Sequence, residues 1–378
     1  MGGLPREDLL TARLRLRDFR DDDIPDVVDS LADPAIRRFL PQIPDPFGAD
    51  EAADLVRRHL PSLWEAGGAC FAVVDARRDV LLGAVSLSRD AADESRGEIG
   101  YWLARRARGH GYAAEAVAAV SEWALTHAFH RLELLTALDN PASQRVALAT
   151  GYRREGIKRG AGTFRDGTRY DKVQWARLAT DPTGRTPRLL PDLPGGELSD
   201  GVVALHPLGP DDAEDAYTVR QLQEVADSSV PPVVPSRRQV LNSCATAASN
   251  WLAGAVASLT IRDAPSDRFA GEITLMYSEP PTGTGMIGYH VAPRWRGRGF
   301  ATRAVRLLSE WALHDAGLAR LEAGVSLTNS ASQTVLERAG FRRVGQEYSR
   351  RPGRHGRVDD YLYELVPGNL VPGRTALA

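Results

Sequence analysis

The chain has few of the residues that would indicate a disulfide-bonded, metal-binding or membrane protein. Its 378 residues include only two cysteines, Cys70 and Cys244, which are too far apart for a disulfide framework or a zinc-site spacing. No apolar run approaches the roughly 20 residues of a membrane-spanning helix. Residues 1–10 carry charges and lack the apolar run of a secretory signal. We therefore expect a cytoplasmic protein with no bound metal and no membrane association.

The chain also lacks an excess of either charge. Forty-seven Lys and Arg face 49 Asp and Glu, so the formal net charge is −2 and there is no overall basic surface for nucleic acid. Hydrophobic residues make up 43% and charged residues 25%, as in ordinary globular proteins. A chain of this length fits two domains of roughly 100–200 residues. We expect two globular domains and no nucleic-acid partner.

The sequence repeats itself at long range. Residues 121–125, Ser-Glu-Trp-Ala-Leu, recur unchanged at residues 309–313, which is 188 positions later. The motif Arg-Gly-His-Gly-Tyr-Ala at 108–113 corresponds to Arg-Gly-Arg-Gly-Phe-Ala at 296–301, with the same offset. A period this long indicates duplication of a whole domain and excludes a solenoid of short repeats.

A segment rich in proline and glycine joins the two copies. Residues 181–199 read DPTGRTPRLLPDLPGGELS and show no sustained periodicity, which is typical of a linker. The sequence therefore predicts an N-terminal domain over 1–180 and a C-terminal domain over 200–378.

Each copy alternates strand and helix patterns. In the first copy, apolar residues at three- and four-residue spacing predict a helix over 111–127, and a second helix is expected over 141–149. Strands mixed with helices at this rhythm predict an α/β or α+β fold, a mixed sheet with helices on its faces. The expected strands lie near 13–17, 70–75, 81–88, 97–103, 131–137, 152–158 and 170–178.

A glycine-containing turn between a strand and a helix is the most informative segment. The first N–H groups of a helix have no partner within the helix and form an anion site together with the helix dipole. Gly109 and Gly111 would let the backbone approach a phosphate closely, and Arg106 and Arg108 would add positive charge. The expected ligand is a pyrophosphate. A single copy would fit a tight strand–helix connection equally well, but the pattern Arg-x-x-Gly-x-Gly recurs at 294–299.

Two better-known phosphate loops do not fit this segment. The third glycine of the dinucleotide fingerprint is absent, as is the acidic residue about 20 positions further on. No Lys-Ser or Lys-Thr follows, which excludes a Walker loop.

These motifs together carry a family resemblance. Each half resembles the GNAT superfamily of N-acetyltransferases, in particular the type that acetylates the N-termini of ribosomal proteins. The resemblance rests on the strand sequence Gly-Tyr-Trp at 100–102, on the repeated loop, and on the Asn-x-x-Ser helix at 140–143 that ends before Gly-Tyr. The second half departs from the pattern, with Gly-Tyr-His at 288–290. The resemblance implies two tandem GNAT folds, each a mixed central sheet flanked by helices, that bind acetyl-CoA.

The same resemblance implies which residues hold acetyl-CoA. Loop amides would bind the pyrophosphate, the strand before the loop would pair with the pantetheine arm, and the Asn and Ser would lie beside the thioester. In the first half these residues are Tyr101, Trp102, Leu103, Arg106, Arg108, Gly109, His110, Gly111, Tyr112, Ala113, Asn140 and Ser143. In the second half they are Tyr289, His290, Val291, Arg294, Arg296, Gly297, Arg298, Gly299, Phe300, Ala301, Asn329 and Ser332.

Acyl transfer to an amine needs a group that removes a proton from the amine. Glu98 is the candidate base of the first half, although a surface carboxylate on an ordinary strand is the competing interpretation. Met286 occupies the corresponding position of the second half and cannot accept a proton. The second half offers Glu272 and His290 instead. We therefore expect the two halves to differ chemically while their cofactor loops agree.

The tyrosine that many superfamily members use as general acid is missing. Ala147 and Leu336 stand at its two positions. Ser143 and Ser332, or water, are left to protonate the departing thiolate, and both serines equally fit a role in helix capping.

The acceptor remains open at this point. The subgroup resemblance favours the N-terminal α-amine of a peptide or protein, and a small-molecule amine (an antibiotic, an amino sugar or a mycothiol-type precursor) is the main alternative. A different class is an acyl-CoA-binding module in which one or both halves do not turn over. The acceptor loops expected at 39–47 and 156–170 are unlike their counterparts at 227–236 and 345–358. A monomer and a homodimer are both compatible with the sequence.

Overall fold

The structure, a computed structural model, describes residues 4–370. The chain divides into two compact units, Met1–Pro187 and Arg188–Ala378, and each is described by itself. The division lies within the segment expected to be a linker. That segment is not wholly a free connector, because Leu190 and Leu193 are buried in the core of the second unit.

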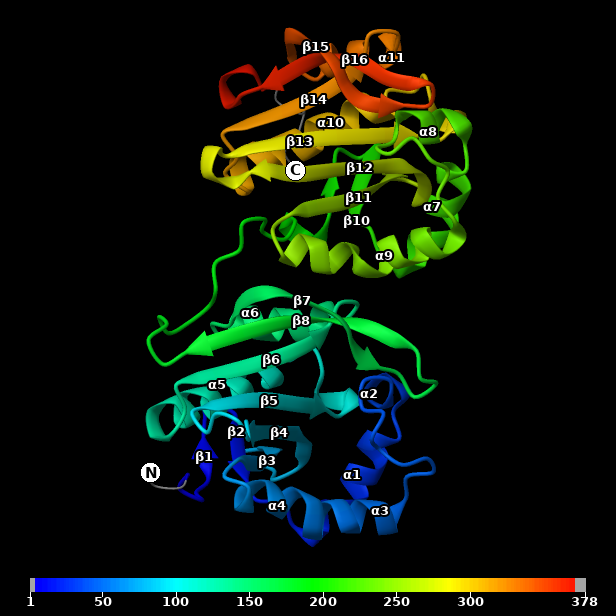
Figure 1. The fold of residues 1–378 in the computed structure, drawn as a ribbon. Helices are drawn as coiled ribbons and strands as arrows, with labels where there is room; N and C mark the ends of the chain where they lie inside the picture. Colours follow the sequence, from blue (N-terminus) through cyan, green and yellow to red (C-terminus); the bar gives the residue numbers. More distant parts are fainter. Residues whose placement is uncertain (1–3, 371–378) are drawn as a thin grey trace. The chain divides into compact units, whose positions relative to one another are not determined.

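The first unit is an eight-stranded mixed sheet (Figure 1). Neighbouring strands run antiparallel except β5 and β6, which are parallel. The strand order is β1-β2-β3-β4-β5-β6-β8-β7. The strands are β1 Leu9–Leu10, β2 Leu14–Arg17, β3 Ala69–Asp75, β4 Leu81–Arg89, β5 Arg96–Leu103, β6 Arg131–Ala137, β7 Arg153–Thr163 and β8 Arg169–Leu178. The helices are α1 Ile24–Leu31, α2 Pro34–Arg37, α3 Ala49–Asp54, α4 Leu60–Glu65, α5 Tyr112–His127 and α6 Pro141–Ala149.

The second unit repeats this topology. Its sheet order is β15-β16-β14-β13-β12-β11-β10-β9, and β13 and β14 are its parallel pair. The prediction of two mixed sheets flanked by helices is therefore confirmed. The strands are β9 Leu198–Ser199, β10 Val203–Pro207, β11 Val256–Asp263, β12 Arg268–Glu279, β13 Thr284–Val291, β14 Arg320–Ser326, β15 Arg342–Gly353 and β16 Gly356–Leu365. The helices are α7 Ala213–Arg220, α8 Gln223–Ser228, α9 Arg237–Leu252, α10 Phe300–Glu310 and α11 Ser330–Arg338.

Helix α5 forms where its apolar spacing predicts a helix. Val117, Val120 and Ala124 recur every three or four residues and are fully buried against the sheet. The helix begins at Tyr112 because Gly111, its N-cap, has a φ of +80°, which interrupts helical geometry.

Helices cover both faces of the sheet in the first unit. The hydroxyl of Tyr101 on β5 contacts Ser143 of α6, whereas the next residue, Trp102, packs against the cluster that contains Val27 and Leu31 of α1. Successive side chains of a strand point to opposite faces. Helix α6 and helix α1 therefore lie on opposite sides of β5.

The helices before β3 and β11 were not predicted in detail, and in each unit a buried ion pair holds their start. Arg17 of β2 donates two hydrogen bonds to Asp23, at 2.8 and 2.9 Å, and both side chains are almost fully buried. Asp212 occupies the same place before α7, but its arginine partner, Arg262, comes from β11. The aspartate is thus retained while the arginine comes from a different strand.

Removing Asp23 should destabilise the first unit. In Asp23→Ala, Arg17 would lose the carboxylate that accepts two of its hydrogen bonds and would keep Asp79 at 3.1 Å. Removing one partner of a buried pair typically costs about 3–5 kcal/mol, and the remaining Asp79 should hold the loss to the lower part of that range. Urea denaturation followed by circular dichroism measures this loss. Asp22→Ala is the matched control, because Asp22 is exposed in the same turn. Equal stability of the two variants would show that the buried pair does not anchor α1.

Candidate functional site

In each unit, the two parallel strands separate after a short stretch of pairing. In the first unit the register ends at Glu98 opposite Glu133, although β5 continues to Leu103 and β6 to Ala137. In the second unit the pairing of β13 with β14 stops at Met286 opposite Glu322. The edge of β5 that faces β6 is therefore left with backbone groups that have no strand partner beyond Glu98. Such groups require hydrogen bonds from another source.

The separated strand leads directly into the glycine loop. Gly109 and Gly111 have φ values of +81° and +80°, and Gly297 and Gly299 repeat them at +73° and +82°. These left-handed conformations favour glycine. A Cβ added at Gly109, Gly297 or Gly299 would meet no protein atom within 4 Å, so all three face open space. The loop has the conformation and the room that a phosphate group at the helix N-terminus needs.

The first arginine of each loop motif braces the loop. Arg106 donates to the carbonyl of Leu81 at 2.7 Å and pairs with Asp26 at 2.8 Å. Arg294 donates to the corresponding carbonyl, that of Phe269, at 3.2 Å. Sequence analysis assigned these arginines to the pyrophosphate, and that role stays a prediction. Their hydrogen bonds hold the loop against the neighbouring strand.

The second arginine of each motif has an equally repeated partner. Arg108 donates from Nε to the carbonyl of Leu103 at 3.1 Å, and Arg296 does the same to Val291 at 2.9 Å. Arg108 also pairs with Asp33 at 2.7 Å. Both loops therefore keep the same internal bracing.

The remaining predicted loop residues divide between exposed and buried positions. The rings of His110 and Tyr112 stack with their centroids 5.7 Å apart. In the second unit, Arg298 lies over the ring of Trp295, whereas the side chain of Phe300 is buried in the core. Phe300 is therefore available to a ligand through its backbone N–H alone.

A pair of hydroxyl groups links the separated strand to the helix that follows β6. The Tyr101 and Ser143 hydroxyls share a hydrogen bond of 2.6 Å, and Tyr289 and Ser332 share one of 2.8 Å. Burial raises the pKa of both phenols, that of Tyr289 to about 12, so both stay protonated near neutral pH. Sequence reasoning named the serines but overlooked the phenolic hydroxyls, although the repeated Gly-Tyr was a signal for them.

The two asparagines predicted beside the thioester act as helix caps. Asn140 accepts a hydrogen bond from the Ser143 N–H at 3.1 Å, and Asn329 accepts one from the Ser332 N–H at 3.0 Å. Each cap fixes the first turn of α6 or α11 and thereby holds the serine beside its tyrosine.

Glu98 lies at the point where the pairing of β5 with β6 ends. It lines a hollow of about 170 Å³ together with Glu133, Arg96 and residues at the end of β4. Partial burial raises the pKa of Glu98; Lys172 opposes this rise, and the neighbouring charge of Glu133 adds to it. The side chain still reaches water. A carboxylate with a raised pKa and solvent access suits a proton acceptor.

The second unit places a charged cluster where the first unit has none. Glu272 of β12 is 5% exposed and accepts two hydrogen bonds from Arg220 of α7, at 3.0 and 2.5 Å. The Nε2 atom of His290 lies 3.6 Å from Glu272 and has no hydrogen-bond partner among the described residues. Burial alone would raise the pKa of Glu272, but His290 and Arg220 outweigh it and hold the pKa below its usual value.

The corresponding positions of the first unit are apolar. Ala84 pairs with Trp102 across β4 and β5 as Glu272 pairs with His290 across β12 and β13. Leu31, the last residue of α1, stands where Arg220 ends α7, and it is buried. Sequence reasoning found Glu272 and His290 but missed Arg220, whose signal was this difference between the copies.

The structure brings some predicted residues together and keeps others apart. The backbone of Tyr101 to Leu103, the loop and the Tyr101–Ser143 pair lie along the separated edge of β5, and Glu98 lies where the pairing of β5 with β6 ends. The hollow that Glu98 lines includes none of the loop residues. Within residues 4–370, no group of three or more His, Cys, Asp or Glu is arranged to hold a metal. None of the described helices is long and apolar enough to cross a membrane.

Comparison with known proteins gives a domain match in each unit. The family described as "Acetyltransferase (GNAT) domain" matches residues 13–153 and 203–342. A probable N-acetyltransferase, YjcK, of Bacillus subtilis (strain 168) is 40% identical over 83 residues, which cover 22% of this chain and 46% of that protein. The ribosomal-protein-serine acetyltransferase of Escherichia coli (strain K12) is 33% identical over 104 residues, or 27% of this chain and 57% of that one. The chain thus spans about half the length of these curated relatives.

Solved structures show similarity over single units. Mycobacterium smegmatis RimJ, solved in complex with CoA-disulfide, matches with a TM-score of 0.42 and 23% identity, over 47% of this chain and 89% of that one.

Breaking the charged cluster should destabilise the second unit. Arg220→Leu would leave the buried Glu272 with His290, at 3.6 Å, as its remaining partner, and losing one partner of a buried pair typically costs about 3–5 kcal/mol. Because the folded-state pKa of Glu272 is lowered, its contribution to stability is present above the unfolded pKa and is lost as pH falls through the folded value. Denaturant unfolding from pH 7 down to pH 3 measures both effects.

The first unit supplies the matched control. The triple variant Arg220→Leu, Glu272→Ala, His290→Trp introduces the residues that the first unit has at these positions, Leu31, Ala84 and Trp102. It should recover most of the stability that Arg220→Leu alone loses. If Arg220→Leu alone unfolded like the unmodified protein, Glu272 would not depend on Arg220.

Proposed function

Because this chain belongs to the acetyltransferase (GNAT) domain family, we propose that it transfers the acetyl group of acetyl-CoA to a primary amine, and that the acceptor is the N-terminal α-amine of a peptide or protein. The observation that carries the proposal is the separated strand that runs into a phosphate-binding type of loop, in both units. The named activity of the E. coli relative supports the choice of acceptor. Two buried, unpaired cysteines suit a cytoplasmic enzyme.

The residues present fit acetyl-CoA. The unpaired edge of β5 beyond Glu98 offers backbone partners to the amides of the pantetheine arm. The free N–H groups at the start of α5 and the open space beside Gly109 offer a place for the pyrophosphate. When bound, acetyl-CoA supplies an activated acyl group.

Glu98 acts as the base of the first unit. A peptide α-amine has a pKa of roughly 8 and is mostly protonated at neutral pH, so it needs help to become a nucleophile. Glu98 accepts the proton that the amine nitrogen loses as its bond to the acyl carbon forms. Its carboxylate has water access and a raised pKa, which brings its basicity closer to that of the amine.

Other groups of the cleft stabilise the charges that develop. A β5 backbone N–H on the unpaired edge donates to the oxygen of the acyl group as that oxygen becomes negative. The Ser143 hydroxyl, which is hydrogen-bonded to the protonated Tyr101, donates a hydrogen bond to the sulfur as the carbon–sulfur bond breaks. The Tyr101–Ser143 pair thus replaces the general-acid tyrosine, whose position is taken here by Ala147.

The second unit binds acetyl-CoA with weaker turnover or with none. Met286 replaces Glu98, and the buried Glu272 is already engaged by Arg220. We therefore assign the main transfer reaction to the first unit and a cofactor-binding role to the second.

Replacing Glu98 by Gln should reduce turnover by about 10²–10⁴-fold, the usual effect of losing a general base. Acetyl-CoA binding should persist because the side-chain shape is retained. The acidic limb of the pH–rate profile should disappear, and in the unmodified enzyme this limb should lie above the ordinary carboxyl pKa. Thiol release with peptide acceptors, followed from pH 5 to pH 9, measures these changes.

Glu272→Gln serves as the control in the other unit and should leave the main turnover intact. The opposite pattern, with turnover unchanged in Glu98→Gln and abolished in Glu272→Gln, would assign catalysis to the second unit.

A further inference from the structure

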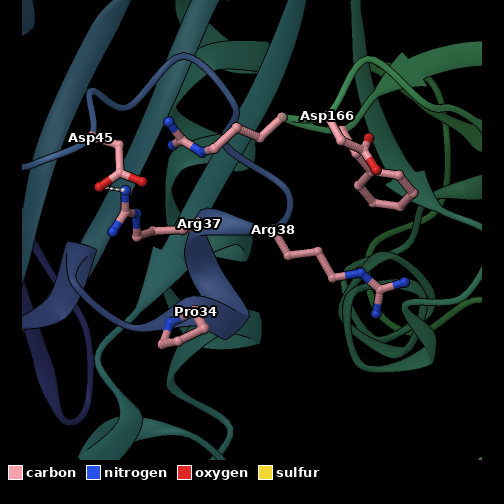
Figure 2. Close-up of a pocket in the computed structure, with 7 residues that line it drawn as sticks. Pro34, Arg37, Arg38, Asp45 and Asp166 are labelled. Atoms are coloured by element: carbon pink, nitrogen blue, oxygen red, sulfur yellow. Dashed lines mark ion pairs between the residues drawn. The ribbon is translucent and has the colours of Figure 1, made fainter.

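A hollow in the first unit lies between two segments that are far apart in the sequence. It has a volume of about 460 Å³. One wall comes from α2 and the loop after it, with Arg37, Arg38 and Asp45, and the other from the turn between β7 and β8, with Phe164 and Arg165. Asp45 and the β7–β8 turn lie in the loops expected to hold the acceptor, at 39–47 and 156–170, whereas α2 comes before the first of these loops. Figure 2 shows Arg37 reaching toward Asp45 while Arg38 extends to the other side.

Direct contacts hold the two walls together. Arg165 donates to the carbonyl of Ile43 at 2.6 Å. The guanidinium of Arg38 lies over the rings of Phe39 and Phe164, at 5.1 and 5.2 Å from their centroids. The ring of Phe164 in turn stacks on another ring of the hairpin, that of Tyr170. The hollow is therefore a built feature with arginine side chains on both walls.

One arginine of the hollow has no acidic partner. Arg37 pairs with Asp45 at 2.8 Å, and Arg38 pairs with Asp139. Within residues 4–370, Arg165 forms no ion pair; a single N–H of its exposed guanidinium donates to a backbone carbonyl. A guanidinium carries five N–H donors in a planar fork that matches a carboxylate. Asp45 and Asp166 also line the hollow, so its three arginines stand against two aspartates, and the charge of Arg165 contributes to the lowered pKa of Asp45. Arg165 is nevertheless the arginine of the hollow that has N–H donors left for an incoming carboxylate.

Strand β6 relates the position of the hollow to that of Glu98. Asp139, the partner of Arg38, follows the last residue of β6 by two positions. It lies six positions after Glu133, which is paired with Glu98 in the register of β5 and β6, and at a strand rise of about 3.3 Å this is at most about 20 Å. An extended peptide spans that distance with about six residues.

Building on the proposed acetyl transfer, we propose that this hollow binds an acidic side chain of the acceptor peptide, within about six residues of its N-terminus. The α-amine lies at Glu98, whose exposed carboxylate forms no ion pair among the described residues, whereas Glu133 beside it is already paired with Arg96 and Arg131. The acidic side chain lies against Arg165 at the far end. The acceptor is thereby selected by two opposite charges a fixed distance apart, which a short extended peptide can satisfy and a small amine cannot.

The second unit lacks this charge pattern at the corresponding place. Its loop exposes Val230 and Val233, at 67% and 61%, and its hairpin exposes Tyr348 at 77%. Its hairpin turn carries an exposed arginine, Arg354, but the loop over 229–236 that exposes the valines contains no arginine. The preference for acidic acceptors should therefore belong to the first unit, the one that carries Glu98.

Matched peptides test the proposal on the full-length protein. Eight-residue peptides with one N-terminal residue and Asp, Asn or Lys at positions 4 to 6 are compared, together with the free amino acid as a small-amine arm. The Asp peptides should have a KM lower by about tenfold or more than the Asn peptides, as expected for one charge-assisted hydrogen bond, with similar kcat. Arg165→Gln should abolish this preference, and Arg165→Glu should reverse it in favour of the Lys peptides.

The control is Arg185→Gln, which removes one exposed positive charge from the same unit outside both walls of the hollow and should keep the preference. Binding of C-terminally labelled peptides to the CoA-loaded protein, read by fluorescence anisotropy, is measured in parallel. Equal KM values for Asp and Asn peptides, unchanged in Arg165→Gln, would overturn the acidic site and leave acetyl transfer standing. Arg165-dependent binding of acidic peptides without any acetylation would keep the site and overturn the proposed reaction. Failure of acidic peptides to bind or react would also overturn the site.

Discussion

The separation of two parallel strands is the constraint on which the site depends. A sheet satisfies its backbone N–H and C=O groups by pairing, and buried groups left unpaired are costly. The pairing of β5 with β6 ends at Glu98, and that of β13 with β14 ends at Met286. The glycine loop and the tyrosine–serine pair are all arranged around the resulting edge. The fold therefore keeps open a place where a ligand with its own amide groups can take the position of a strand.

The two units preserve this cleft while changing the contacts around it. At the start of α5, Glu115 pairs with Arg13 from the turn before β2, and at the same position of α10 Arg303 pairs with Asp200. The acidic residue is on the helix in the first unit and on the turn in the second, but an ion pair joins the helix to the turn in both. The residues on the other face of the sheet differ between the units. The first unit has the apolar residues Leu31, Ala84 and Trp102 and a hollow lined by arginines, whereas the second has a buried charged cluster around Glu272 and exposed valines. This contrast is expected if both units retain the cofactor and only one retains the reaction.

Features that follow from local patterns could be predicted from the sequence. The period of α5, the alternation of the strands and the repeated loop are set by neighbouring residues, and the structure contains them at nearly the predicted bounds. Contacts between distant segments could not be read in this way. Arg220 reaches Glu272 across 52 positions, and Arg165 reaches Ile43 across 122. The burial of Leu190 also escaped prediction, because its core partners come from the second unit as a whole.

The central claim is that both clefts hold the cofactor although only one carries out the transfer. Native mass spectrometry of the full-length protein, titrated with CoA, tests it directly by counting the molecules bound per chain. The account predicts saturation at two CoA molecules, and two again in the Glu98→Gln variant. Saturation at one molecule, or none bound at all, would contradict it.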